Sequence, residues 1–206
     1  MGKLNVPAIV ARALVLALTL GAARPAAPDS TQTASQSMEA KMRILQSTEV
    51  QRAGSYPAVV ITENEANSYL KVHSPAFLPP GVHEPNVNFQ PEHVTGSADV
   101  NFDEFSRVYT NPNDWGPKVM AAMFKGNQRV TATGKVVSSN GQAMVQIEKV
   151  TVGSMTVPPW LVDYLLQNYL QPKYKFDLSK PLPLPNHVRQ IVVGAGQTTF
   201  LRGPRQ

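Results

Sequence analysis

The chain has 206 residues, of which 42% are hydrophobic and 16% charged, and this is enough for one domain with its own core. The formal charge is +5, but the basic residues are scattered and form no cluster, so the composition does not favour a nucleic-acid partner. There is no cysteine, which excludes disulfides, thiolate metal sites and a cysteine nucleophile.

The first 23 residues are typical of a secretory signal peptide. Lys3 and Arg12 precede a short apolar run at 13–20, and the small residues at 21–23 are suited to cleavage. The uninterrupted apolar run is about half of the roughly 20 residues that a membrane span requires. We therefore expect cleavage and a periplasmic or otherwise extracytoplasmic protein, with a retained N-terminal anchor as the alternative.

The domain is expected to begin after a linker. Residues 24–36 are rich in Pro, Ala, Ser, Thr and Gln, a composition typical of a disordered segment. Residues 37–206 contain no internal repeat and no second composition shift, so they predict a single domain. A first helix is expected from Ser37, as its cap, to about Glu49.

A strand and a second helix follow at the next strong local signal. The apolar run at 57–61 predicts a short strand. Thr62 and Glu65 then have the spacing of a capping box, which predicts a helix that reaches about His73. Ile61 and Ala66 are placed to form a hydrophobic staple across this helix start.

The middle and the end of the chain predict mainly strands. Residues 74–91 contain five prolines and favour only short edge-type segments, whereas residues 93–102 alternate as a strand does. Residues 114–124 are a candidate helix capped by Asp114. The last predicted element is a hairpin over residues 187–202.

The longest predicted unit is a hairpin followed by a helix, from Gln128 to Gln171. Asn140 and Gly141 are typical of a type I′ turn between two strands. The apolar alternation slips by one residue near Lys149, which predicts a β-bulge. Pro159 suits the first turn of the helix that follows.

These elements predict an α+β fold with an antiparallel, bulged sheet and a few helices on its concave side. The apolar face of the long hairpin and its helix would line either an ordinary core or a ligand groove. The candidate lipid-binding positions on that face are Val130, Ala132, Val145, Ile147, Val150, Val152, Leu165 and Tyr169.

Catalytic signatures are scarce. The chain has no nucleophile elbow, zinc-protease motif, P-loop or dinucleotide fingerprint. The best metal candidate is the set His83, Glu84, Glu92 and His93, for which a polar, Pro-rich surface loop is the alternative. A second acidic set, read as a solvated edge, comprises Asp99, Asp103, Glu104 and Asp114.

Two patterns carry a resemblance to a known family: T-E-x-E-x-N at Thr62–Asn67 and V-x-V-G-x-x-x-V-P at Val150–Pro158. With the order of the elements, they make Ser37–Arg202 resemble exported bacterial proteins of the tubular lipid-binding superfamily, relatives in fold of the SMP and BPI-type domains. The resemblance implies a strongly curved antiparallel sheet wrapped around amphipathic helices as a half-barrel. Its hydrophobic groove would hold acyl chains without catalysis or a cofactor.

The expected function is therefore extracytoplasmic binding or transport of phospholipid or a similar acyl-chain amphiphile, with transient contact to a membrane surface. The alternative is an envelope-assembly or protein-interaction module with a filled core and no ligand. A metal-assisted hydrolase using His83, Glu84, Glu92 and His93 is a third possibility.

Overall fold

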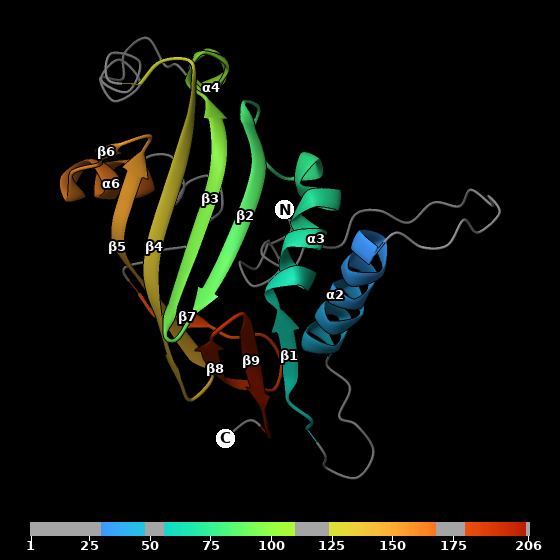
Figure 1. Ribbon diagram of the computed structural model, residues 1–206. Coiled ribbons are helices and arrows are strands. Elements are labelled where there is room, and N and C mark those ends of the chain that lie inside the picture. Colours follow the sequence, from blue (N-terminus) through green and yellow to red (C-terminus); the bar gives the residue numbers. More distant parts are fainter. Residues whose placement is uncertain (1–29, 48–55, 110–123, 168–179, 205–206) are drawn as a thin grey trace, which may run out of the picture.

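The computed structural model describes residues 30–47, 56–109, 124–167 and 180–204, which form an α+β fold (Figure 1). The helices are α2 (Ser30–Gln46), α3 (Glu63–His73), the 3-10 helix η1 (Ser74–Ala76), α4 (Phe102–Tyr109) and α6 (Pro159–Leu165). The strands are β1 (Val59–Thr62), β2 (Val82–Gln90), β3 (His93–Asn101), β4 (Asn127–Ser139), β5 (Gln142–Val152), β6 (Met155–Thr156), β7 (Leu182–Pro183), β8 (Val188–Gly194) and β9 (Gln197–Arg202).

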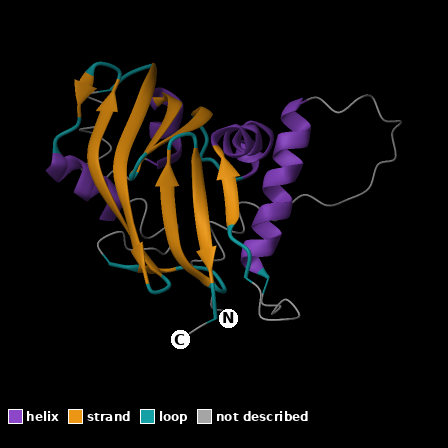
Figure 2. Cartoon of the chain, turned by 60° about the horizontal axis from the view of Figure 1, so that its bottom comes forward, coloured by secondary structure: helices purple, strands orange, loops and turns teal. Residues whose placement is uncertain are grey.

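The strands form two antiparallel sheets, where the sequence predicted one. The larger sheet has the order β2-β3-β4-β5-β6, with β7 also paired to β5, and the smaller has the order β1-β9-β8 (Figure 2). At one point between the two sheets, a side chain takes the place of a backbone hydrogen-bonding partner. Ser138 Oγ on β4 accepts a hydrogen bond from Ile191 N of β8 at 2.7 Å and donates one to Ile191 O at 2.8 Å.

The long hairpin has its predicted turn and bulge. Asn140 and Gly141 have φ values of 49° and 77°, as a type I′ turn requires. Thr133 pairs with Lys149 whereas the next residue, Gly134, pairs with Ile147, so β5 carries one extra residue beside Lys149. The α+β class and the antiparallel sheet are confirmed, whereas the curvature of the sheet stays a prediction.

The predicted capping box at the start of α3 is confirmed. Thr62 Oγ1 accepts a hydrogen bond from Glu65 N at 3.2 Å, and Glu65 Oε2 accepts one from Thr62 N at 2.9 Å. Glu65 also binds α2, because its carboxylate accepts hydrogen bonds from Lys41 Nζ and Ser37 Oγ. One carboxylate therefore caps α3 and holds α2 against it.

The predicted start of the first helix was wrong. Helix α2 begins at Ser30, so Ser37 lies inside the helix and contacts Glu65 instead of capping α2. Ala34 and Ser35, placed in the expected linker, are buried helical residues. Tertiary packing therefore makes this segment helical although its composition favours disorder.

Helix α3 also covers the outer edge of β2 (Figure 1). The Asn67 side-chain amide donates to Val87 O at 2.8 Å and accepts from Val87 N at 2.7 Å, as a neighbouring strand would. One turn earlier, Glu63 Oε2 accepts from Phe89 N at 3.0 Å. These side chains satisfy an edge that would otherwise present unpaired backbone groups.

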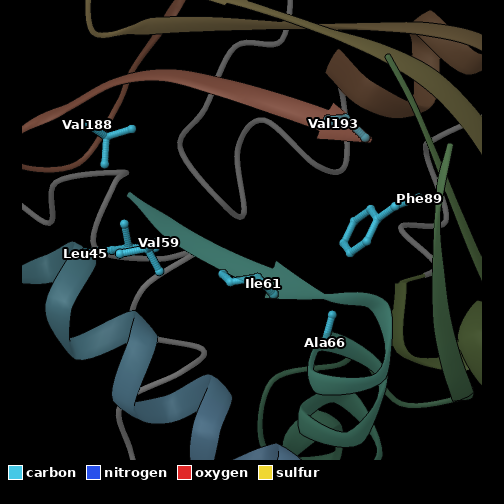
Figure 3. Packing of buried hydrophobic residues seen from close by; sticks show 7 residues of the cluster. All are labelled: Leu45, Val59, Ile61, Ala66, Phe89, Val188 and Val193. Carbon is cyan, nitrogen blue, oxygen red and sulfur yellow. The ribbon is translucent and has the colours of Figure 1, made fainter. Parts of the chain in front are cut away.

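Two hydrophobic clusters form the core. The first, called here the α3-side cluster, lies between α2, α3, β1, β8 and β2 (Figure 3). Its buried members are Leu45, Val59, Ile61, Ala66, Phe89, Val188 and Val193. The second, the α6-side cluster, has Val100, Phe102, Phe124, Val152, Val157 and Leu161 as its buried members.

Leu161 is the residue that fixes α6, and it is fully buried at 0% exposure. The positions predicted for this helix, Leu165 and Tyr169, did not include it. Pro158 is the N-cap of α6 and Pro159 its first helical residue, as expected. The predicted helix at 114–124 and the continuation of α6 beyond residue 167 lie outside the described residues.

Candidate functional site

The inner face of the large sheet carries an apolar strip between the two clusters. Along β4, Val130 packs with the α6-side cluster and Val136 with the α3-side cluster. On the same face of β3, β4 and β5, Val94 packs against the α3-side cluster and Val150 against the α6-side cluster, whereas six neighbouring residues are in neither. We call them the central apolar strip: Gly96, Ala98, Ala132, Gly134, Val145 and Ile147.

The strip combines very small residues with aliphatic side chains that are only partly covered. Gly96 pairs with Ala132, and Gly134 pairs with Ile147, whose exposed fraction is 36%. Among the residues that the structure describes, none has an atom within 4 Å of a Cβ placed on Gly96, so this part of the structure leaves open space beside it. The strip is therefore a shallow apolar surface between two packed ends.

The structure divides the eight predicted lipid-binding residues into three groups. Ala132, Val145 and Ile147 lie in the central apolar strip. Tyr169 lies outside the described residues. The remaining four pack in or against the α6-side cluster and are accounted for as core: Val130, Val150, Val152 and Leu165.

The opposite face of the same strands is polar and well bonded. Thr95 and Thr133 share a hydrogen bond of 3.1 Å across β3 and β4. Arg129 binds Asp99 at 3.0 Å and Ser97 at 2.9 Å. The sheet is thus amphipathic: this face is mainly polar, although Val137 is exposed on it, and the inner face is mainly apolar.

The candidate metal residues do not converge. His83 pairs with Asp99 near one end of the β2–β3 hairpin, whereas His93 pairs with Gln90 at the turn. Glu92 binds Lys135 Nζ at 2.7 Å instead of approaching either histidine. Within the described ranges, no three His, Asp or Glu side chains come together as a metal site would require, so the hydrolase hypothesis fails on geometry.

A large cleft of about 1080 Å³ lies between α3 and the start of β2. It is lined by several prolines and by charges that largely compensate one another. Arg129 is paired with Asp99, and Glu104 faces His83 at 4.0 Å. This cleft contains no residue of the central apolar strip, and its charges do not favour one class of ligand.

A smaller cleft of about 250 Å³, called here the β8 cleft, lies where the Asn140-Gly141 turn meets β8. His187, Arg189 and Gly203 are among its lining residues, and no acidic side chain of the described structure lines it. No sequence pattern indicates this cleft, because its residues come from separate strands and a distant turn.

Both family-like patterns have structural roles. In the first, Thr62 and Glu65 cap α3 while Glu63 and Asn67 satisfy the β2 edge. In the second, Val152 and Val157 are buried in the α6-side cluster, and Gly153 turns the chain with φ 57°. These motifs therefore account for the local fold and are not evidence of a ligand.

No family model matches the sequence, and no curated protein does. Among solved structures, the chain has a likeness to one described as "Crystal structure of lipopolysaccharide binding protein", with 12% identity and a TM-score of 0.24. The match covers 71% of this chain but 40% of that one, so this chain spans less than half of its length. A likeness at this level establishes neither a shared fold nor a shared ligand.

The helices in the described ranges are all too short or too polar to cross a membrane.

Proposed function

We propose that the protein binds the acyl chain of a phospholipid or similar amphiphile, non-covalently, along the central apolar strip. The observation that carries this proposal is the space that the described residues leave open beside Gly96, on an apolar face whose two ends are packed. Ala132 and Ile147 would be the floor and one wall of this shallow groove.

The driving force is burial of apolar surface on both partners. An acyl chain gains about 0.8 kcal/mol for each methylene removed from water, so about ten methylenes supply about 8 kcal/mol before the cost of ordering the chain. Ile147, which is 36% exposed, would lose unfavourable contact with water at the same time. Small residues such as Gly96 and Ala132 allow the chain to approach the backbone.

The remaining parts of the proposal concern setting and mechanism. The protein would act outside the cytoplasm, would contact membranes transiently and would perform no covalent chemistry. N-terminal sequencing of protein recovered from the producing cell tests export, with a mature start after Ala23 as the expected result. A soluble cytoplasmic form that retains Met1 would contradict this part.

Native mass spectrometry after detergent-free purification tests the ligand directly. We expect an added mass of one amphiphile, or uptake of a phospholipid supplied in solution. A bare protein mass with no uptake would contradict the proposal and favour a protein-interaction module with a filled core.

A further inference from the structure

One side of β5 is paired only at its ends. Within the described residues, the side of β5 that faces away from β4 pairs with β7 up to Ala143 and with β6 from Thr151 onward. These two short strands lie at opposite ends of β5 (Figure 1). Residues 144–149 between them form an open strand edge, called here the β5 edge, which is about 20 Å long at about 3.3 Å per residue.

The alternation of the strand identifies the open backbone groups. Gly141 O points away from β4, because it accepts a hydrogen bond from Leu184 N at 2.8 Å. Successive residues of an antiparallel strand direct their backbone groups to alternate sides, so Val145 and Ile147 also direct N–H and C=O away from β4. In the part of the chain that the structure describes, these groups have no hydrogen-bond partner. The side chain of Ile147 is 36% exposed, so the edge is open to solvent.

The fold closes its other long strand edges. Side chains of α3 bond the outer edge of β2, and Ser138 of β4 bonds the edge of β8 at Ile191. Unpaired edges accept a further strand, and native proteins usually block them. The bulge beside Lys149 disturbs one end of the β5 edge, but it leaves Val145 and Ile147 available.

The flanking strands restrict what can occupy the β5 edge. A second copy that paired through its own β5 would bring a strand of 11 residues, with β6 and β7 attached on the same side. Those attached strands would collide with the first copy, because the open edge spans residues 144–149 alone. A separate extended segment of about six residues fits between β6 and β7 without this collision.

The side chains along the β5 edge indicate the chemistry of such a segment. Val145 and Ile147 lie on the inner, apolar face of the sheet, so every second residue of the segment would be apolar. The polar face presents Lys149, which has no ion pair among the described residues, whereas Glu148 pairs with His93 at 3.3 Å. An acidic residue on the polar face of the segment would complement Lys149.

We propose that the β5 edge binds an extended peptide segment of a partner protein as an added strand. The segment has alternating apolar residues on the inner face and an acidic residue on the polar face. Backbone hydrogen bonds with Val145 and Ile147 provide the affinity, as in other cases of strand addition. This site does not depend on acyl-chain binding to the central apolar strip.

Hydrogen exchange of the free protein, followed by NMR, tests whether the edge is open. We expect the amides of Val145 and Ile147 to exchange faster than that of Val87, whose N–H is bonded by Asn67 at 2.7 Å. Protection of Val145 and Ile147 in the free protein would overturn the proposal, because the edge would then be paired by the chain itself or by a second copy.

Titration with the peptide acetyl-Thr-Val-Glu-Val-Thr-Val-amide tests the proposed occupant. The matched control peptide carries an N-methyl group on each valine, which removes the donors that would face β5 and keeps the side chains. We expect saturable binding of the first peptide, with protection of the Val145 and Ile147 amides, and no binding of the second. Lys149→Gln should weaken binding about twofold to fivefold, as loss of an exposed ion pair does. Absence of saturable binding, or equal binding of the two peptides, would overturn the proposal.

Discussion

Two regions of this protein bury charged side chains, and they do so in opposite ways. At the start of α3, Glu65 accepts hydrogen bonds from Lys41, Ser37 and the backbone of Thr62. At the end of β9, Nε and Nη1 of Arg202 are buried and have no hydrogen-bond partner among the described residues. The first arrangement stabilises the fold by itself, whereas the second leaves two donors unsatisfied within the described residues.

This difference indicates which polar groups are candidates for a function. The residues around Glu65 have a conspicuous sequence pattern, yet every one of their roles is structural. Arg202 has no pattern at all, but its unsatisfied donors are a cost that folding alone does not explain.

Glu65→Ala should produce the largest loss of stability. It removes the capping box and leaves Lys41 and Ser37 without their shared acceptor. Lost caps cost about 1 kcal/mol and lost charged hydrogen bonds about 1.5–3 kcal/mol, so we expect a total of about 2–4 kcal/mol. Urea denaturation measures it. Glu92→Ala, which breaks an exposed pair with Lys135, is the control and should leave the midpoint nearly unchanged.

The same carboxylate should make stability depend on pH. Burial raises the pKa of Glu65, but hydrogen bonds from Lys41, Ser37 and Thr62 outweigh burial and lower the pKa from 4.5 to about 2. The stabilisation is therefore complete above pH 4.5 and is lost as the pH falls towards 2, by about 3 kcal/mol in total. Between pH 4.5 and 2, the free energy of unfolding should decrease less for Glu65→Gln than for wild type, as measured by denaturation at each pH. An equal decrease in the two proteins would contradict the assignment of this pH dependence to Glu65.

Gly134→Ala should be moderately destabilising, because its Cβ would lie 2.7 Å from Gln146 O beside the β5 bulge. Overpacking of this kind costs about 1–3 kcal/mol. Gly96→Ala is the matched control on the neighbouring strand, where no described residue has an atom within 4 Å of the added Cβ. The thermal midpoints of the two variants test whether there is more space beside Gly96 than beside Gly134. An equal decrease of the midpoint in both variants would contradict the open strip.

Arg202→Met should have the smallest effect on stability. The change removes two unsatisfied buried donors and keeps an aliphatic side chain of similar length, so we expect a change of about zero or a slight gain. Guanidinium chloride denaturation distinguishes a change near zero from a loss of stability as large as that expected for Glu65→Ala. A clear loss of stability would mean that Arg202 has a structural partner, as Glu65 does.

The features that could be predicted from the sequence have patterns that lie within a few residues. Thr62 and Glu65 lie three residues apart, Asn140 and Gly141 are adjacent, and the slip at Lys149 lies within one strand. Each of these patterns restricts the backbone directly, so the capping box, the turn and the bulge could all be predicted.

The rest depends on pairings between distant residues. Nothing around Val59 specifies that β1 pairs with β9, so the separation into two sheets was not predicted. Alternation placed Val130 and Ala132 on one face, but the assembly of the α6-side cluster from distant segments decides that Val130 packs against it and Ala132 does not. The pairing of Arg202 with Val188 follows from the register of β8 and β9, and has no sequence pattern of its own.

Ala132→Trp tests whether the central apolar strip is open and receives an acyl chain. Thr131→Trp is the matched control, because the adjacent residue points to the polar face of the same strand. Phospholipid uptake and the thermal midpoint are measured together for both variants. We expect Ala132→Trp to lose uptake with a nearly unchanged midpoint, and Thr131→Trp to retain uptake. If Ala132→Trp instead unfolds much earlier than wild type, position 132 belongs to a closed core, and the strip is not a binding site.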